Sequence, residues 1–142
     1  MIAVDTNILV YAHRRDSIFH AVAKDRIVAL AAGRAAWAIP WPCIHEFLAV
    51  VTRAFDPPST PVQATAQVEA WLESTSVVLL GETDEHWQTL KRLILSSKVT
   101  AGRIHDARIA ALCIEHGVRE LWSADRDFSR FVGLKSVNPL VR

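Results

Sequence analysis

The feature that most constrains the fold is the alternation of short apolar runs with longer segments of helical periodicity. The short runs of strand type lie at 2–4, 37–39, 77–80 and 121–123, and 135–137 is a candidate for a fifth, edge strand. Parallel strands cannot be joined by tight turns and need long crossovers, which are usually helices. The alternation therefore predicts an α/β fold with a central parallel sheet of four to five short strands and helices on both faces. At 142 residues the chain is expected to form one domain, 1–142, because a domain averages roughly 150 residues.

Helix boundaries are expected where capping residues flank the helical segments. Asp5, Thr6 and Asn7 have N-cap chemistry and precede a short helix, and Gly117 is a natural C-cap. The remaining helices are expected over 17–35, from Pro42 to about Phe55, from Thr60 onward, after 83–86 and over 104–116.

Composition excludes several classes of protein. Hydrophobic residues make up 51% and charged residues 22%, which is typical of a globular chain and not of a disordered one. The formal net charge of +1 excludes a globally basic nucleic-acid coat, although it permits a local basic patch. Two cysteines are too few for a disulfide framework, and no apolar run is long enough for a membrane span. The N-terminus lacks a signal-peptide pattern, so the expected location is the cytoplasm.

Acidic residues stand where the predicted strands end. Asp5 ends the first strand, Asp125 and Asp127 follow the fourth, and Asp106 lies in the first turn of the helix leading to that strand. Ligands of open parallel sheets bind beyond the carboxyl ends of the strands, at the point where the strand order reverses. These acids are therefore expected to meet at one edge of the sheet.

Glu46 is the fifth candidate acid, because its helix, 43–51, is apolar nearly all round and is expected to be buried. A carboxylate on a buried helix is costly unless it has a partner. Three of the acids also have an ordinary structural explanation: Asp5 as a helix cap, Asp127 as a surface or turn residue, and Glu46 in a salt bridge with Arg53.

Converging carboxylates repel one another unless some hold protons or a cation lies among them. Carboxylate oxygens favour a hard ion such as Mg²⁺ or Mn²⁺. Zinc is disfavoured because the sequence has no Cys/His cluster at ligand spacing. A hard ion in such a cleft recruits phosphate oxygens and activates water, so the expected chemistry is phosphodiester hydrolysis.

Four motifs occur in an order that resembles a known family. They are Val4-Asp5-Thr6-Asn7-Ile8-Leu9, Glu46 on its helix, Ile104-His105-Asp106-Ala107 and Ser123-Ala124-Asp125-Arg126-Asp127-Phe128. Together they span nearly the whole chain and resemble PIN-domain ribonucleases, in particular the VapC-type toxins of VapBC toxin–antitoxin pairs. The resemblance implies a PIN-like three-layer fold.

The resemblance also implies roles for individual residues. Asp5, Glu46, Asp106 and Asp125 would be catalytic and hold one or two Mg²⁺ or Mn²⁺ ions, with Asp127 as a possible further ligand, a water-mediated contact or a cap. Thr6, Asn7 and Ser123 would be polar support for the acids. The family often has threonine where Ser123 stands, and the hydroxyl is kept.

The activity implied is endonucleolytic cleavage of structured RNA, commonly tRNA or rRNA, by a metal-activated water that leaves a 5′-phosphate and a 3′-hydroxyl. Family members usually form homodimers and are silenced by a small VapB-type antitoxin. RNA binding needs cations near the cleft. The candidates are Lys98, Arg103, Arg108 and Arg126, and the alternative for each is a solvated surface charge.

Two other functions compete with this interpretation. One is an aspartate-based phosphotransfer protein. The sequence disfavours it, because receivers need an acid at the end of the third strand, which here reads Leu79-Leu80-Gly81, and phosphatases need an Asp where Asn7 stands. The other is a non-catalytic PIN-like protein-binding module, which need not be stabilised by Mg²⁺ or Mn²⁺.

The five tryptophans divide into two groups. Trp71 and Trp87 lie on apolar helix faces and Trp122 in a predicted central strand, so all three are expected in the core. Trp37 and Trp41 flank a short strand and are candidates for a dimer or antitoxin surface.

Overall fold

The computed structural model describes residues 1–141 and has one five-stranded parallel sheet. The strands are β1 (Ile2–Val4), β2 (Trp37–Pro40), β3 (Val77–Leu80), β4 (Glu120–Trp122) and β5 (Lys135–Val137). Their spatial order is β3-β2-β1-β4-β5. The predicted α/β class, the parallel pairing and the fifth strand are confirmed.

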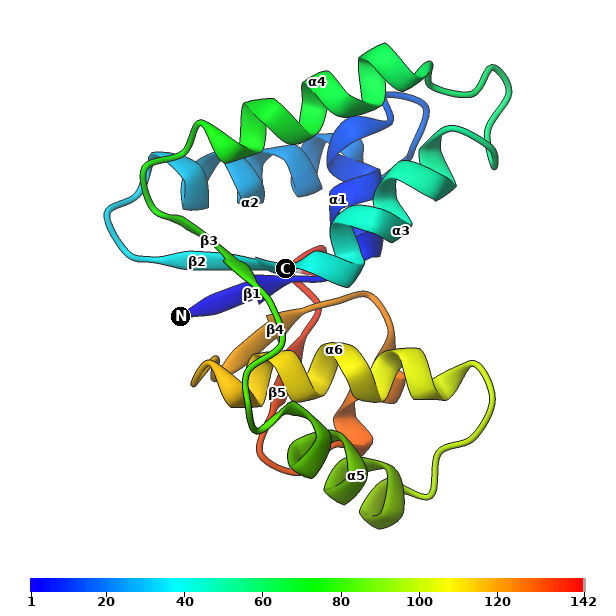
Figure 1. The fold of residues 1–142 in the computed structure, drawn as a ribbon. Helices are drawn as coiled ribbons and strands as arrows, with labels where there is room; N and C mark the ends of the chain where they lie inside the picture. Colours follow the sequence, from blue (N-terminus) through cyan, green and yellow to red (C-terminus); the bar gives the residue numbers. More distant parts are fainter. Residues whose placement is uncertain (142) are drawn as a thin grey trace.

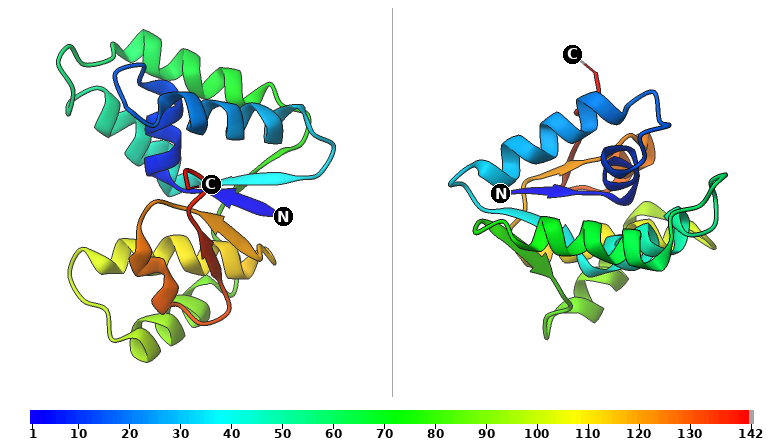
Figure 2. Two further views of the ribbon diagram at one scale, coloured as in Figure 1. Left: turned by 180° about the vertical axis from the view of Figure 1, so that it is seen from behind. Right: turned by 90° about the horizontal axis from the view of Figure 1, so that it is seen from above.

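Six helices and one 3₁₀ turn connect these strands. They are α1 (Thr6–His13), α2 (His20–Ala32), α3 (Trp41–Val51), α4 (Pro61–Leu72), α5 (His86–Ser97), α6 (Arg103–Glu115) and η1 (Arg126–Arg130). Figure 1 shows α1 to α4 on one side of the sheet and α5 and α6 on the other, and the reverse view in Figure 2 agrees. This is the predicted three-layer arrangement. None of the helices within residues 1–141 is long and apolar enough to cross a membrane.

The strand order explains why the helices divide in this way. The chain moves outward from β1 to β2 and β3, then returns across the sheet to β4 and continues to β5. Crossovers between parallel strands are right-handed, so the two directions of travel place their helices on opposite faces. The reversal occurs beside β1, and a crevice is expected there, beyond the carboxyl ends of β1 and β4.

Local capping chemistry sets several helix ends. The Asp5 side chain caps α1 by accepting from the Thr6 amide, and Thr60 and Gln63 form a reciprocal capping box at the start of α4. Two expected boundaries were wrong. The second helix begins at His20 and not at 17, because the His20 amide is held in a turn by the Ser17 carbonyl. The third helix ends at Val51, where the Val51 carbonyl accepts from the Ser59 amide.

Burial corrects two expectations about the tryptophans. Trp37 is fully buried in β2, where its indole N–H donates to Ser74, so it offers no dimer or antitoxin surface. Trp87 is 64% exposed, although it shares a helical face with half-buried Leu90. The reason is that α5 packs mainly on α6 at the outside of the molecule and fully buries only Leu93. Trp71 is buried as expected, against Phe47.

Candidate active site

A pocket of about 320 Å³ lies beyond the carboxyl end of β1, between helices from the two faces of the sheet. The four acids proposed from the sequence all line it. The complete lining is Asp5, Thr6, Asn7, Val10, Tyr11, Glu46, Val50, Asp106, Ile109 and Asp125. We call this hollow the acid pocket. Its residues come from α1, α3, α6 and the segment after β4, so the fold gathers acids that are widely spaced in the chain.

Asp5 is the buried floor of the acid pocket, with a relative exposure of 5%. Its Oδ1 accepts from the Thr6 amide at 2.8 Å and from the Cys43 thiol at 3.6 Å, and its Oδ2 accepts from the Ser123 hydroxyl at 2.7 Å. Burial raises the pKa of Asp5 from 3.8 to about 6; the Ser123 and Thr6 hydrogen bonds lower it, and the Glu46 charge raises it further. Asp5 therefore holds its proton to a higher pH than an exposed aspartate does.

Ser123 joins the two strands whose ends form the site. Besides donating to Asp5, its hydroxyl oxygen accepts from the Asp125 amide at 3.0 Å and from Asn7 Nδ2 at 3.3 Å. The Asn7 side-chain oxygen accepts from the Ala124 amide at 3.1 Å, so Asn7 bonds both side chain and backbone of the segment after β4. Asn7 and Ser123 therefore lie where polar support was expected.

Glu46 lies on the pocket rim and not inside the core, contrary to expectation. The residue is exposed, because α3 buries only the stripe formed by Cys43, Ile44, Phe47 and Val51. Although α3 has apolar residues on nearly every face, only one of its faces is buried. Among the described residues Glu46 has no salt-bridge partner, and the expected Arg53 pair is not formed. Its carboxylate is open to a ligand in the pocket.

Asp106 and Asp125 face each other across the acid pocket and share one cation. Arg103, the first residue of α6, places Nη1 at 2.9 Å from Asp106 Oδ2 and at 3.3 Å from Asp125 Oδ2. Asp106 is partly buried rather than fully buried. Its position in the first turn of α6 also suits the positive end of the helix dipole.

Asp127 lies beside the pocket but does not line it. Its amide donates to Asp125 Oδ1 at 2.9 Å, and its carboxylate pairs with Arg103 and, at 3.6 Å, with Arg130. Of the three roles considered for Asp127, these contacts favour the structural one.

The other candidate RNA-binding cations lie farther from the acids. Arg108 faces Glu82 at 3.9 Å, Lys98 is the exposed left-handed C-cap of α5, and Arg126 lines a separate hollow behind Asp125. Only Arg103 of the four contacts the candidate acids directly.

The donor set of the acid pocket suits a hard divalent cation. All four acids supply oxygen, and the hydroxyl of buried Thr6 has no hydrogen-bond partner within residues 1–141. An unpaired buried hydroxyl is costly, so a ligand or its bound water is needed to satisfy it. In the present side-chain arrangement, no three His, Cys, Asp or Glu side chains among the described residues are close enough to hold one ion. Mg²⁺ is usually held by one or two carboxylates and several waters, so a group of three side chains is not required.

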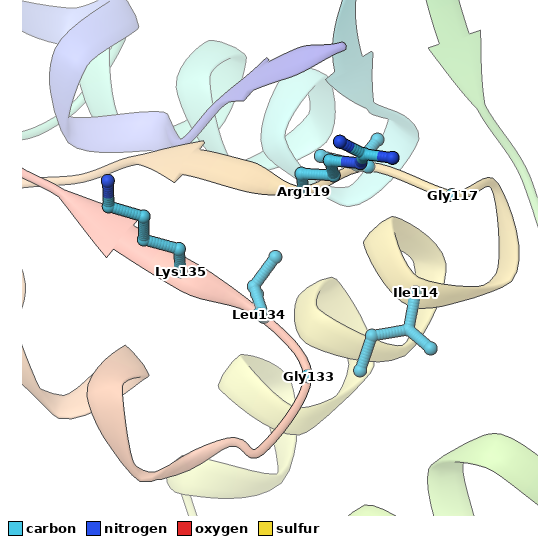
Figure 3. A pocket seen from close by; sticks show the side chains of 7 residues that line it. Ile114, Gly117, Arg119, Gly133, Leu134 and Lys135 are labelled. Carbon is cyan, nitrogen blue, oxygen red and sulfur yellow. The ribbon is translucent and has the colours of Figure 1, made fainter.

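A larger hollow, of about 500 Å³, lies at the opposite edge of the sheet (Figure 3). It is bounded by Ile114, the 117–119 turn and 133–135, near the amino ends of β4 and β5. No acid, thiol or hydroxyl side chain lines it. Size does not identify the site, because hollows of about 690 Å³ beside His13 and about 600 Å³ beside Gln88 are larger still; the chemistry of the lining favours the acid pocket.

Sequence analysis missed the apolar wall of the acid pocket. Val10 and Tyr11 from α1, Val50 from α3 and Ile109 from α6 complete its lining. Val50 stands four residues after Glu46 and Ile109 three after Asp106, so helical spacing could have identified both. Cys43 is a buried free thiol, and it donates to Asp5.

We expect the stability of the metal-free protein to fall as pH rises from about 4 to about 6. Asp5 binds its proton more tightly when folded, so its contribution to stability is complete below 3.8 and is lost as the pH passes about 6. A shift of that size corresponds to about 3 kcal/mol. Chemical denaturation in EDTA at a series of pH values would measure it, with Asp5→Asn as the control lacking this slope. Parallel curves for the two proteins would contradict the prediction.

The sequence matches the PIN domain family over residues 2–134. It is similar to VapC ribonuclease Mb2897 of Mycobacterium bovis, with 34% identity over 142 residues, covering 99% of this chain and 96% of the relative. It is also similar to ribonuclease VapC48 of Mycobacterium tuberculosis, with 31% identity over 137 residues, covering 95% and 94%.

Solved structures agree on the fold. VapBC2 from Rickettsia felis, solved bound to promoter DNA, has a TM-score of 0.71 at 19% identity and covers 97% of this chain and 98% of its own. VapC20 of Mycobacterium tuberculosis, described as a sarcin–ricin loop cleaving toxin, has a TM-score of 0.69 at 21% identity and covers 95% and 99%. At these identities the likeness supports the architecture.

Proposed function

Because the chain belongs to the PIN domain family, we propose that it is an endoribonuclease and the toxin of a type II toxin–antitoxin pair. The observation that carries the proposal is the convergence of Asp5, Glu46, Asp106 and Asp125 on one pocket, in a chain whose full-length relatives are VapC ribonucleases. The whole chain, 1–142, acts as one nuclease domain. Its localisation to the cytoplasm stays a prediction.

The four acids of the pocket are the catalytic and metal-binding residues in this proposal. Asp5 and Glu46 approach from one side of the sheet, and Asp106 and Asp125 from the other. When bound, one or two Mg²⁺ or Mn²⁺ ions supply Lewis-acid stabilisation of phosphate oxygens and a more acidic water. Asp5 must be ionised to contribute, and because its pKa is raised to about 6, cation binding is expected to weaken as the pH falls below that value.

The remaining pocket residues orient these acids. Ser123 and Asn7 fix the position of the Asp5 carboxylate relative to the segment that bears Asp125. The Thr6 hydroxyl is free to bond water or a phosphate oxygen. The apolar wall of Tyr11, Val50 and Ile109 limits the water around the reacting phosphate.

The substrate is structured RNA of the tRNA or rRNA class, and the partner is a VapB-type antitoxin. Solved relatives include VapBC complexes, and one relative is described as cleaving the sarcin–ricin loop. We propose a homodimer as the assembled form. Lys98, Arg103, Arg108 and Arg126 remain the candidate RNA-binding cations.

The test is cleavage of total RNA by the purified, antitoxin-free protein with Mg²⁺ or Mn²⁺, with the cut ends mapped by sequencing. We expect a few discrete cuts bearing 5′-phosphates, absent with EDTA and absent for Asp5→Asn. Cuts that persist in EDTA would contradict the metal dependence. A folded protein with no cleavage and no Mn²⁺-induced rise in melting temperature would favour the alternative function, a non-catalytic binding module.

A further inference from the structure

Arg103 occupies the centre of the acid cluster. Its Nη1 contacts Asp106 Oδ2 at 2.9 Å and Asp125 Oδ2 at 3.3 Å, and its Nη2 pairs with the carboxylate of Asp127. One guanidinium therefore ties together three carboxylates from two elements, α6 and the segment after β4. The planar guanidinium of arginine has several N–H donors and can bond three carboxylates, whereas the ammonium group of lysine cannot match this geometry.

This arrangement uses the oxygens that a cation would need. Asp125 Oδ1 accepts from the Asp127 amide and Oδ2 from Arg103, so both of its oxygens are engaged. Asp106 Oδ2 is engaged by the same guanidinium nitrogen. An approaching divalent ion would meet a like charge bonded to the same carboxylate oxygens, which is unfavourable.

Arg103 is also placed so that its side chain can withdraw. The side chain is 44% exposed and starts at the first residue of α6, after the exposed turn 100–102. The backbone at this point is fixed, because the Arg103 amide donates to the Thr100 carbonyl at 3.1 Å. Withdrawal therefore needs only side-chain rotation, and exposed ion pairs contribute little to stability, so their loss is not costly.

From these contacts we infer that Arg103 and a divalent cation are alternative occupants of the Asp106 and Asp125 carboxylates, so that the ion binds only after the guanidinium has left. The inference rests on the proposed function, because it concerns the metal site of that nuclease. It makes Arg103 a positioning residue that lowers the apparent metal affinity of the resting protein and offsets the repulsion among the acids until the ion arrives.

The experiment is calorimetric titration of Mn²⁺ into the antitoxin-free full chain. The variants are Arg103→Gln, Arg103→Lys and the control Arg108→Gln, which removes the same charge from the same helix at a residue paired with Glu82. We expect Mn²⁺ to bind about tenfold more tightly to Arg103→Gln, within the usual range for coupled sites. Arg103→Lys is expected to bind more tightly as well, because lysine keeps the charge but cannot bridge three carboxylates. Arg108→Gln should match the wild type.

Melting temperatures with and without Mn²⁺ give a second measurement. The rise on adding Mn²⁺ should be larger for Arg103→Gln than for the wild type, because tighter binding to the folded state stabilises it more. Unchanged or weaker binding by Arg103→Gln would overturn the inference. Tighter binding by Arg103→Gln with wild-type affinity for Arg103→Lys would also overturn it, since charge alone would then explain the effect.

Wild-type protein and Asp5→Asn separate this inference from the proposed function. Mn²⁺ binding that is present in the wild type and lost in Asp5→Asn supports the metal site, whatever the Arg103 variants do. Absence of Mn²⁺ binding in every protein would overturn both the metal dependence and the inference.

Discussion

Asp106→Asn is expected to reduce RNA cleavage by on the order of 10³-fold while leaving the protein folded, because the substitution removes a charge that faces the developing transition state in the acid pocket. The side chain of Asp106 is 19% exposed, and asparagine has nearly the same shape as aspartate, so the amide replaces it without a cavity. Initial cleavage rates of a mapped RNA site, with far-UV circular dichroism as the check on folding, would measure this effect.

Asp127→Asn is the matched control for that experiment. Asp127 shares Arg103 with Asp106 and is also an aspartate near the pocket, but it does not line it. We expect Asp127→Asn to lower cleavage by less than about tenfold, the effect of a changed surface pair and not of a lost ligand. If Asp127→Asn abolished cleavage and Asp106→Asn did not, the assignment of the pocket acids would be wrong.

Ser123→Ala is expected to have the second largest effect, through metal affinity. Its hydroxyl contacts Asp5, Asn7 and the Asp125 amide, so its loss frees two candidate ligands from their orientation. Removing a group that orients a metal ligand typically costs about 10–100-fold in metal affinity. The Mn²⁺ dissociation constant, measured by titration, should increase by that factor.

Ser123→Thr is expected to restore the affinity, because threonine keeps the hydroxyl that donates to Asp5. Rescue by threonine distinguishes the hydroxyl from the packing of a residue that is only 2% exposed. Wild-type Mn²⁺ affinity in Ser123→Ala would show that the hydrogen bonds of the Ser123 hydroxyl do not position the acids. Equal weakening in both variants would point to packing instead.

The sequence was most informative where chemistry follows backbone topology. Asp5 and Asp125 could be placed at one edge of the sheet because the carboxyl ends of parallel strands converge wherever the strand order reverses. Glu46 was placed in the correct pocket for the wrong reason: an apolar helix was expected to be buried all round, but α3 covers the core with one stripe only. Trp87 failed similarly, because the position of α5 at the outside of the molecule is a tertiary property.

Arg103 shows what sequence reasoning could not reach. It was a candidate for RNA binding because it precedes Asp106, yet its guanidinium spans acids that are up to 24 residues away in the chain. The Arg103 side chain is long and flexible, and the carboxylate oxygens that it contacts depend on the distances between α6 and the segment after β4. Local pattern does not specify those distances, so only the three-dimensional arrangement could reveal the contact.

The hydrogen bond between Ser123 and Asp5 joins residues 118 positions apart, and this separation has a consequence for synthesis of the protein. The pocket needs strand β1 at the start of the chain and the segment after β4 near its end. During translation the N-terminal part emerges first, and it carries only half of the acids. The acid pocket therefore cannot assemble on a translating chain until the segment after β4 has left the ribosome.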